Sequence, residues 1–195
     1  MIYIETEIGQ IDLGEALGMV SEQRRQYALS YSSEHDQRLS LAAYLLLQRA
    51  LKAEYGIIEQ PIFSYGEHGK PMLVGHSDIF FSLSHCRDAV ACVIASDPVG
   101  IDIESLSRYK ERVAARVMND DEQRHIASSS EPSLAFMRLW TMKESLLKMT
   151  GEGITTDLRK VLSVNAEKCR FETMVYPNFV CSVCFSVAHK SNFFG

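Results

Sequence analysis

The sequence has no run of 18 apolar residues, the length that a membrane-spanning helix needs, so we expect no membrane partner. It also lacks the basic start of a secretory signal, because its first ten residues, MIYIETEIGQ, carry two acids and no base. Positive charge is scarce: the formal net charge of −5 argues against a general nucleic-acid binder. We therefore expect a cytoplasmic protein without nucleic-acid or membrane partners.

Cysteine is sparse as well, and the five cysteines are an odd number, which favours free thiols in a reducing cytoplasm over a disulfide framework. Cys181 and Cys184 have the C-x-x-C spacing of metal and redox sites. They lie in FVCSVCFSVA (179–188), a run typical of a β-strand, where residues three apart face opposite sides. We interpret them as structural residues.

What the sequence does contain is enough for a globular core: 195 residues, of which 46% are hydrophobic. A capping-box-like spacing at Ser33 and Asp36 starts a predicted long helix that ends at Gly56, and a second helix is predicted over 133–149, stopped by GEG. The apolar stripe predicted for the first helix consists of Leu39, Ala43, Leu46, Leu47, Ala50 and Leu51.

Further elements are indicated by shorter runs. The segment 63–75 predicts a loop or hairpin, and the apolar runs at 79–85, 89–96 and 99–104 predict consecutive strands. Short helices are expected over 108–118 and after Asn119, and two or three strands in the tail, at 161–165, 169–176 and 179–188. Helices followed by strands occur in each half of the chain, which favours the α+β class.

Two carboxylates stand one residue apart in the apolar run GIDIESL (100–106). On a strand Asp102 and Glu104 would share one face, with Ile103 pointing the opposite way into the core. Two such charges about 4 Å apart repel by about 4 kcal/mol at an effective dielectric near 20. A bound divalent cation would relieve this repulsion, whereas the alternative is an ordinary solvated strand edge.

The helix over 133–149 carries LWTMKESLLK, which places Trp140, Glu144 and Lys148 on one face at spacings of four residues. One interpretation is a Glu144–Lys148 surface ion pair beside a buried tryptophan. The other is that Glu144 joins Asp102 and Glu104 as a third oxygen ligand, if the helix crosses the strand. A set of carboxylates without His or Cys suits a hard ion such as Mg²⁺ rather than zinc.

Several cations and small polar side chains would suit an anionic ligand near such a site. Ser84 and His85 end a predicted strand, and Lys70 lies in a Gly-Lys-Pro turn. The other candidates are Lys143 and Lys148 beside Glu144, and Arg24, Arg25 and Arg38 in the N-terminal helical region. A metal site surrounded by these side chains predicts a pyrophosphate-containing ligand.

Together these motifs resemble the 4'-phosphopantetheinyl transferase superfamily, in its compact, monomeric, surfactin-synthetase-activating type. The matching motifs are GKP at 69–71 followed by FSLSH at 81–85, VGIDIE at 99–104, and LWTMKESLLKMTGEG at 139–153. The W-x-x-K-E-S pattern, with a lysine four residues after the glutamate, is specific when it follows G-I-D-I-E by about forty residues. The resemblance covers roughly residues 20–165.

The resemblance implies two similar α/β halves related by a pseudo-twofold axis, with the active site in the cleft between them. Residues 1–98 would form the coenzyme A side, and residues 99–195 would carry the metal site and the carrier-docking surface. It implies transfer of 4'-phosphopantetheine from coenzyme A to a serine of an apo acyl or peptidyl carrier protein, with Mg²⁺ (or Mn²⁺) as cofactor and release of 3',5'-ADP. It also implies a monomer.

The resemblance also assigns roles to residues. Asp102, Glu104 and Glu144 become metal ligands, and the base for the serine is either Glu144 or a metal-bound water. Lys148 would hold pyrophosphate oxygens with Lys143 nearby, while Ser84, His85 and Lys70 would contact coenzyme A. Arg38, and Arg24 or Arg25, would meet its 3'-phosphate.

A basic stretch over residues 108–126 is the expected carrier-docking region, and an ordinary solvated helix is the alternative there. Two further hypotheses stay open for the whole chain: a coenzyme A or nucleotide-binding module without catalysis, and a metal-dependent pyrophosphate hydrolase. The three acids with Lys148 favour catalysis over passive binding.

Overall fold

The protein is described by a computed structural model that places residues 1–153, 157–165 and 167–187. The N-terminal half begins with an edge strand and three helices, and ends with two hairpins. Its elements are β1 (Ile2–Glu5), η1 (Ile8–Gln10), α1 (Leu13–Gly18), α2 (Glu22–Leu29), α3 (Glu34–Tyr55), β2 (Phe63–Tyr65), β3 (Pro71–Leu73), β4 (Phe80–His85) and β5 (Val90–Ala95).

The C-terminal half repeats this succession of one strand, several helices and a final hairpin. Its elements are β6 (Val99–Ser105), η2 (Leu106–Arg108), α4 (Glu111–Val117), α5 (Asp120–Ser128), α6 (Pro132–Thr150), α7 (Val161–Asn165), β7 (Cys169–Val175) and β8 (Phe179–Ser186). The two three-stranded antiparallel sheets have the orders β1-β5-β4 and β6-β8-β7, so in each the last strand is central. This mixture of helices and small antiparallel sheets confirms the α+β class.

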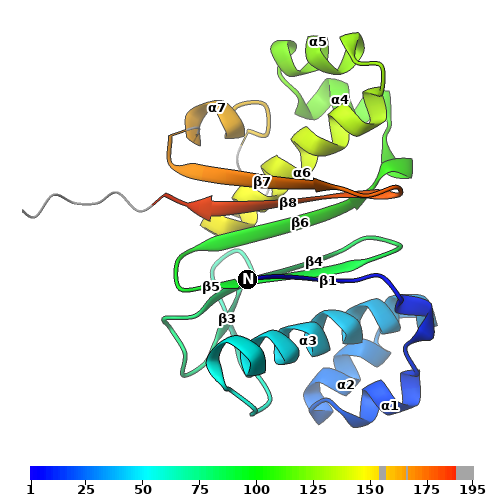
Figure 1. Ribbon diagram of the computed structural model, residues 1–195, viewed down its shortest axis with the longest axis vertical. Helices are drawn as coiled ribbons and strands as arrows, with labels where there is room; N and C mark the ends of the chain where they lie inside the picture. The colour runs from blue at the N-terminus through cyan, green and yellow to red at the C-terminus, as the bar shows by residue number, and fades with distance from the viewer. Residues whose placement is uncertain (154–156, 166, 188–195) are drawn as a thin grey trace, which may run out of the picture.

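The sheets lie against each other, with α3 covering the outer face of one and α6 the outer face of the other (Figure 1). Ile101, Ile103 and Val183 face Ala91 and Val93 in a fully buried cluster between the sheets. The prediction that Ile103 points into the core is therefore confirmed. Because Gly100 and Asp102 alternate with these residues, they face α6 instead.

The long helices form where capping and periodicity indicate. Ser33 accepts a hydrogen bond from the amide of Asp36, and Gly56 ends α3 in the left-handed conformation. All six residues of the predicted α3 stripe are buried. Asn119 caps α5 in a reciprocal capping box with Glu122, and Gly151 ends α6.

The tail departs from expectation at one element. Residues 161–165 form the short helix α7 and not a strand, because Leu158, Val161 and Leu162 share the i, i+3, i+4 spacing with which they pack beneath α6. The strand predicted over 179–188 is β8, which ends at Ser186, and residue 188 lies outside the described residues. Cys181 and Cys184 face different clusters and are buried free thiols.

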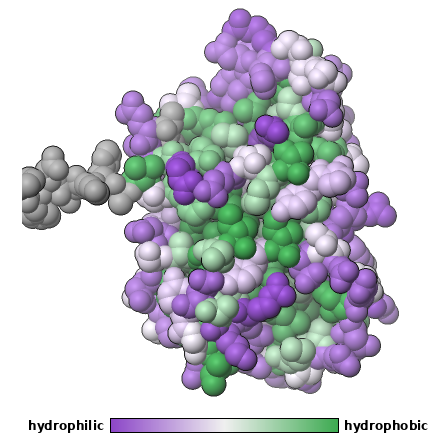
Figure 2. All heavy atoms as spheres, viewed as in Figure 1, coloured by the Kyte–Doolittle hydropathy of each residue, from purple (hydrophilic) through white to green (hydrophobic). Residues whose placement is uncertain are grey.

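Hydrophobic side chains show along the middle of the face in Figure 2, over the strands of the two sheets, and hydrophilic side chains dominate around it. No helix in the described part of the chain combines the length and the apolar character that crossing a membrane requires.

Candidate active site

The crossing of α6 over β6 depends on Gly100. A Cβ atom at this position would lie 2.0 Å from the carbonyl oxygen of Ser145 and 2.4 Å from the amide nitrogen of Met149. No real side chain tolerates such distances to backbone atoms, so only glycine allows the helix to approach this closely. The approach brings the side chains of Glu144 and Lys148, on the strand-facing side of α6, to the carboxylate two residues after Gly100.

Asp102 is the centre of the resulting network. Its side chain is only 7% exposed, and the ammonium nitrogen of Lys148 lies 2.7 Å from its Oδ1. Ser84 donates a hydrogen bond to the same oxygen at 2.9 Å and accepts one from Lys148 at 2.8 Å. The N-terminal half thus contributes Ser84, from the end of β4, to a site whose other members come from β6 and α6.

Glu144 lies beside this network in a half-buried position. Burial raises the pKa of its carboxyl group, and the nearby charge of Asp102 raises it further, while Lys148 acts in the opposite direction. Among the described residues, neither Oε1 of Glu144 nor Oδ2 of Asp102 has a hydrogen-bond partner, although both atoms are buried. Two buried carboxylate oxygens without partners are available as hard oxygen ligands for a cation.

Glu104 has a different partner from these two acids. Nη1 of Arg108 lies 3.1 Å and 3.0 Å from its two carboxylate oxygens. Burial, followed by the charge of Asp102, raises the pKa of Glu104, and Arg108 counteracts this. No three His, Cys, Asp or Glu side chains in the described ranges are arranged to hold a metal ion directly. In this structure, cations engage two of the three expected ligands.

A cavity of about 310 Å³ adjoins the network on the other side. Lys70 lines it together with Glu144 and Lys148, and its ammonium group donates a hydrogen bond to the carbonyl of Met149 at 2.7 Å, near the C-terminus of α6. Burial lowers the pKa of Lys70. His85 follows Ser84 at the exposed end of β4, and partial desolvation and the charge of Lys148 lower its pKa.

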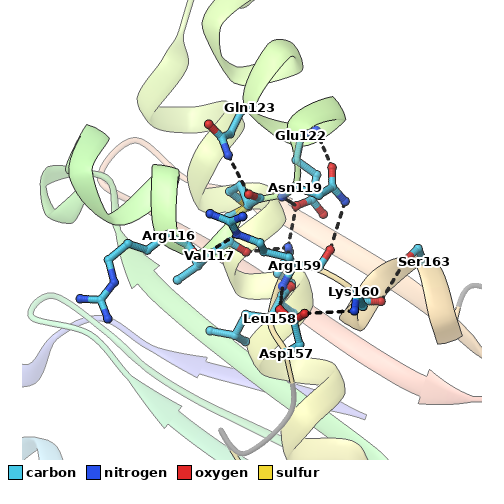
Figure 3. A network of polar contacts seen from close by, with 12 residues as sticks. Arg116, Val117, Asn119, Glu122, Gln123, Asp157, Leu158, Arg159, Lys160 and Ser163 are labelled. Atoms are coloured by element: carbon cyan, nitrogen blue, oxygen red, sulfur yellow. Dashed lines mark hydrogen bonds and ion pairs between the residues drawn. The ribbon is translucent and has the colours of Figure 1, made fainter.

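Lys143 does not join this site, which corrects its expected role in assisting Lys148. Its side chain is 0% exposed, forms an ion pair with Glu122 at 2.6 Å, and donates to the carbonyls of Val117 and Leu158 at 3.0 Å and 2.7 Å. These partners belong to a polar network that connects α6, α5 and the segment before α7 (Figure 3). Consecutive helical residues differ by about 100° in direction, so Lys143 and Glu144 face different surroundings.

The three arginines expected at a 3'-phosphate also lie elsewhere. Arg38 donates to the carbonyl of Ile11 and pairs with Glu34. Arg24 donates to Ser40 and lies over the rings of Tyr27 and Tyr44. Arg25 contacts the carbonyl of Leu17 and Glu22. None of these arginines is among the residues that line the cavity beside Lys70.

Some residues of the site escaped the sequence prediction. Ser82 accepts a hydrogen bond from the amide of Ile101, just as Ser84 accepts one from Ile103, so the two hydroxyls join β4 to the edge of β6. Their spacing of two residues on one strand was the available signal. Nothing in the sequence pointed to the contact between Arg108 and Glu104 in particular.

The fold and the site define an α+β protein in which carboxylates and lysines gather beside a cavity where its two sheet-and-helix units meet. A family model for the "4'-phosphopantetheinyl transferase superfamily" matches residues 98–192. The chain is thus similar to this superfamily over about half of its length.

Curated relatives carry the same description. The chain is 32% identical over 160 residues to 4'-phosphopantetheinyl transferase gsp of Aneurinibacillus migulanus, covering 80% of this chain and 65% of the relative. It is 28% identical to 4'-phosphopantetheinyl transferase Sfp of Bacillus subtilis, over 80% of this chain and 71% of the relative. It is also 27% identical to 4'-phosphopantetheinyl transferase AcpT of Salmonella typhimurium, over 85% of this chain and 88% of the relative. The chain thus spans about two thirds of the length of the first two.

Proposed function

We propose that the protein transfers the 4'-phosphopantetheine group of coenzyme A to a serine hydroxyl of an apo acyl or peptidyl carrier protein, with release of 3',5'-ADP. The observation that carries this proposal is the convergence of Asp102, Glu144 and Lys148 where α6 crosses β6, with two buried carboxylate oxygens unpartnered among the described residues. Relatives described as 4'-phosphopantetheinyl transferases support it.

Coenzyme A would place its pyrophosphate beside Lys148 and Ser84. Lys70 lines the same cavity as Lys148, and His85 follows Ser84 at the end of β4. Ammonium groups and a hydroxyl suit phosphate oxygens because charge-assisted hydrogen bonds are the stronger ones. Binding would draw Lys148 from Asp102 toward the phosphates and so free a carboxylate oxygen. The contact of Arg24 and Arg38 with the 3'-phosphate stays a prediction from the family resemblance.

The oxygen donors of the three acids suit a magnesium ion, with manganese as a substitute, although the described side chains are not arranged around one point in this structure. Asp102, Glu104 and Glu144 would supply hard carboxylate oxygens, of which Oδ2 of Asp102 and Oε1 of Glu144 are buried and unpartnered within the described chain. When bound, the ion would neutralise charge on the pyrophosphate.

In the reaction, the serine oxygen of the carrier attacks the β-phosphorus of coenzyme A. The bond from this phosphorus to the 3',5'-ADP oxygen breaks as the new oxygen–phosphorus bond forms. Glu144 accepts the serine proton, and its raised pKa suits a general base. Lys148 stabilises the negative charge that collects on the leaving oxygen.

The proposal extends to the organisation of the molecule. Residues 1–98 and 99–195 would be halves related by a pseudo-twofold axis, as their matching strand orders support. The second half would dock the carrier, in part through residues 108–126. We propose a monomer acting in the cytoplasm, where the five buried thiols would stay reduced.

The test is to incubate the protein with coenzyme A, Mg²⁺ and a panel of apo carrier proteins, and to follow carrier mass. We expect phosphopantetheine addition to at least one carrier. Asp102→Ala should lower the rate by at least about 10²-fold, because a phosphoryl-transfer site loses a charge-positioning group. Asp97→Ala removes an exposed carboxylate next to the start of β6 and serves as the matched control.

Each other result points to a different function. Coenzyme A binding without modification of any carrier would favour a non-catalytic binding module. Release of 3',5'-ADP without a carrier would favour a hydrolase. Near-normal transfer by Asp102→Ala, with an unchanged melting temperature, would contradict the assignment of Asp102.

A further inference from the structure

Arg108 contacts one carboxylate of the cluster formed by Asp102, Glu104 and Glu144. The η2 turn after β6 brings residue 108 back over residue 104, and one guanidinium nitrogen lies within 3.1 Å of both Glu104 oxygens. The side chain of Glu104 is 15% exposed, whereas that of Arg108 is 67% exposed. The acid is therefore held in the protein while its partner can swing into solvent.

The three carboxylates differ in which oxygens are engaged. Asp102 and Glu144 each have one buried oxygen that lacks a partner within the described chain. Both oxygens of Glu104 are engaged by Arg108. A divalent ion that uses all three acids must either displace the guanidinium group from Glu104 or share the carboxylate with it, and the positive charge of Arg108 opposes the approach of the ion in both cases.

We propose that Arg108 is a positioning residue that engages Glu104 in the free protein and competes with the divalent ion for this carboxylate. This inference rests on the metal ligands of the proposed function. An ion pair whose arginine is mostly exposed is weak, so the ion competes with Arg108 at a modest loss of affinity. The free protein therefore binds the ion less tightly than the same three carboxylates would without Arg108.

The experiment is a titration of the full chain with Mn²⁺, without coenzyme A or carrier, in which free Mn²⁺ is followed by electron paramagnetic resonance. Arg108→Gln should bind Mn²⁺ about two- to tenfold more tightly than the unaltered protein. Arg170→Gln is the matched control, because it removes an equally charged, exposed arginine from its ion pair with Glu172 on β7. It should leave the affinity unchanged.

A double-mutant cycle separates competition at Glu104 from a general effect of charge. If Arg108 acts through Glu104, Arg108→Gln has no effect on Mn²⁺ affinity in a Glu104→Gln background. Equal tightening in both backgrounds, or no tightening in the unaltered background, would overturn the inference. Unchanged affinity on Glu104→Gln alone would instead remove Glu104 from the proposed metal ligands, which is a failure of the proposed function. Circular dichroism of each variant checks that the fold is kept.

Discussion

At the scale of single residues, the site is a set of charges held at some expense of stability. Asp102 is compensated by Lys148 and Ser84, but Glu144 has a buried oxygen with no partner among the described residues. Burial raises the pKa of Glu144, which means that the folded protein disfavours the charged carboxylate relative to the unfolded chain. This destabilisation is absent below the unfolded pKa of glutamate and fully present above the raised folded pKa.

We therefore expect Glu144→Gln to raise the free energy of unfolding at pH 7 by about 1 kcal/mol, a typical size for one substitution. The gain should vanish as the pH falls below about 4, where the unaltered carboxyl group is protonated in both states. The same variant should lose phosphopantetheine transfer. Urea unfolding at pH 7 and pH 4 measures the first effect, and carrier mass the second.

Glu67→Gln is the matched control for this prediction, because Glu67 is exposed in the turn between β2 and β3. It should change neither stability nor transfer. The opposite result would be a Glu144→Gln variant with a lower free energy of unfolding than the unaltered protein at pH 7 but not at pH 4. It would show that the carboxylate stabilises the fold.

At the scale of elements, the contact of α6 with β6 positions the site. We expect Gly100→Ala to lower the free energy of unfolding by about 3 kcal/mol or more, because its methyl group must displace the backbone at Ser145 and Met149. The shift would also move Lys148 from Asp102, so transfer should be lost in any folded fraction. Urea unfolding followed by circular dichroism measures the change.

Gly18→Ala is a suitable control because a Cβ atom at Gly18, the last residue of α1, would meet no atom within 4 Å. It should be neutral or slightly stabilising, since alanine favours a helix over glycine. A Gly100→Ala protein as stable as the Gly18→Ala protein would mean that α6 adjusts its position freely.

Much of this arrangement could be predicted from the sequence. Caps at Ser33, Gly56 and Asn119 delimit helices through local hydrogen bonds, and these elements were found where expected. The strand predicted over 161–165 was wrong. So short a segment takes its conformation from packing, which overrides the β-propensity of its valines. The first strand, β1, was missed because it forms by pairing with the distant β5.

The candidate site also contains residues that the sequence predicts and residues that it does not. Asp102, Glu144 and Lys148 follow from strand and helix periodicity, which fixes the face on which each side chain lies. Lys143 was placed wrongly because adjacency in sequence is not adjacency on a helix, and its buried partners come from α5 and the segment before α7. The contact of Arg108 with Glu104 depends on one turn of irregular backbone, which no periodicity describes.

At the scale of the whole molecule, the halves share one core and one polar seam. The cluster between the sheets contains side chains of β5, β6 and β8. The hydroxyl oxygens of Ser82 and Ser84 accept hydrogen bonds from the backbone amides of Ile101 and Ile103. Neither sheet can therefore separate without exposing buried apolar surface and leaving amide groups unpaired. The candidate active site lies at this junction, so its geometry depends on both halves staying folded together.

We accordingly expect a single cooperative unfolding transition. The one tryptophan, Trp140, lies in α6 and reports on the C-terminal half, whereas far-ultraviolet circular dichroism also reports on α3 in the N-terminal half. The urea midpoints from both probes should coincide. Ser82→Ala leaves the Ile101 amide without its acceptor and should lower the free energy of unfolding by about 1–3 kcal/mol, with both midpoints moving together. Midpoints that separate, in the unaltered protein or in this variant, would mean that each half is stable alone and that the shared core contributes little to the site.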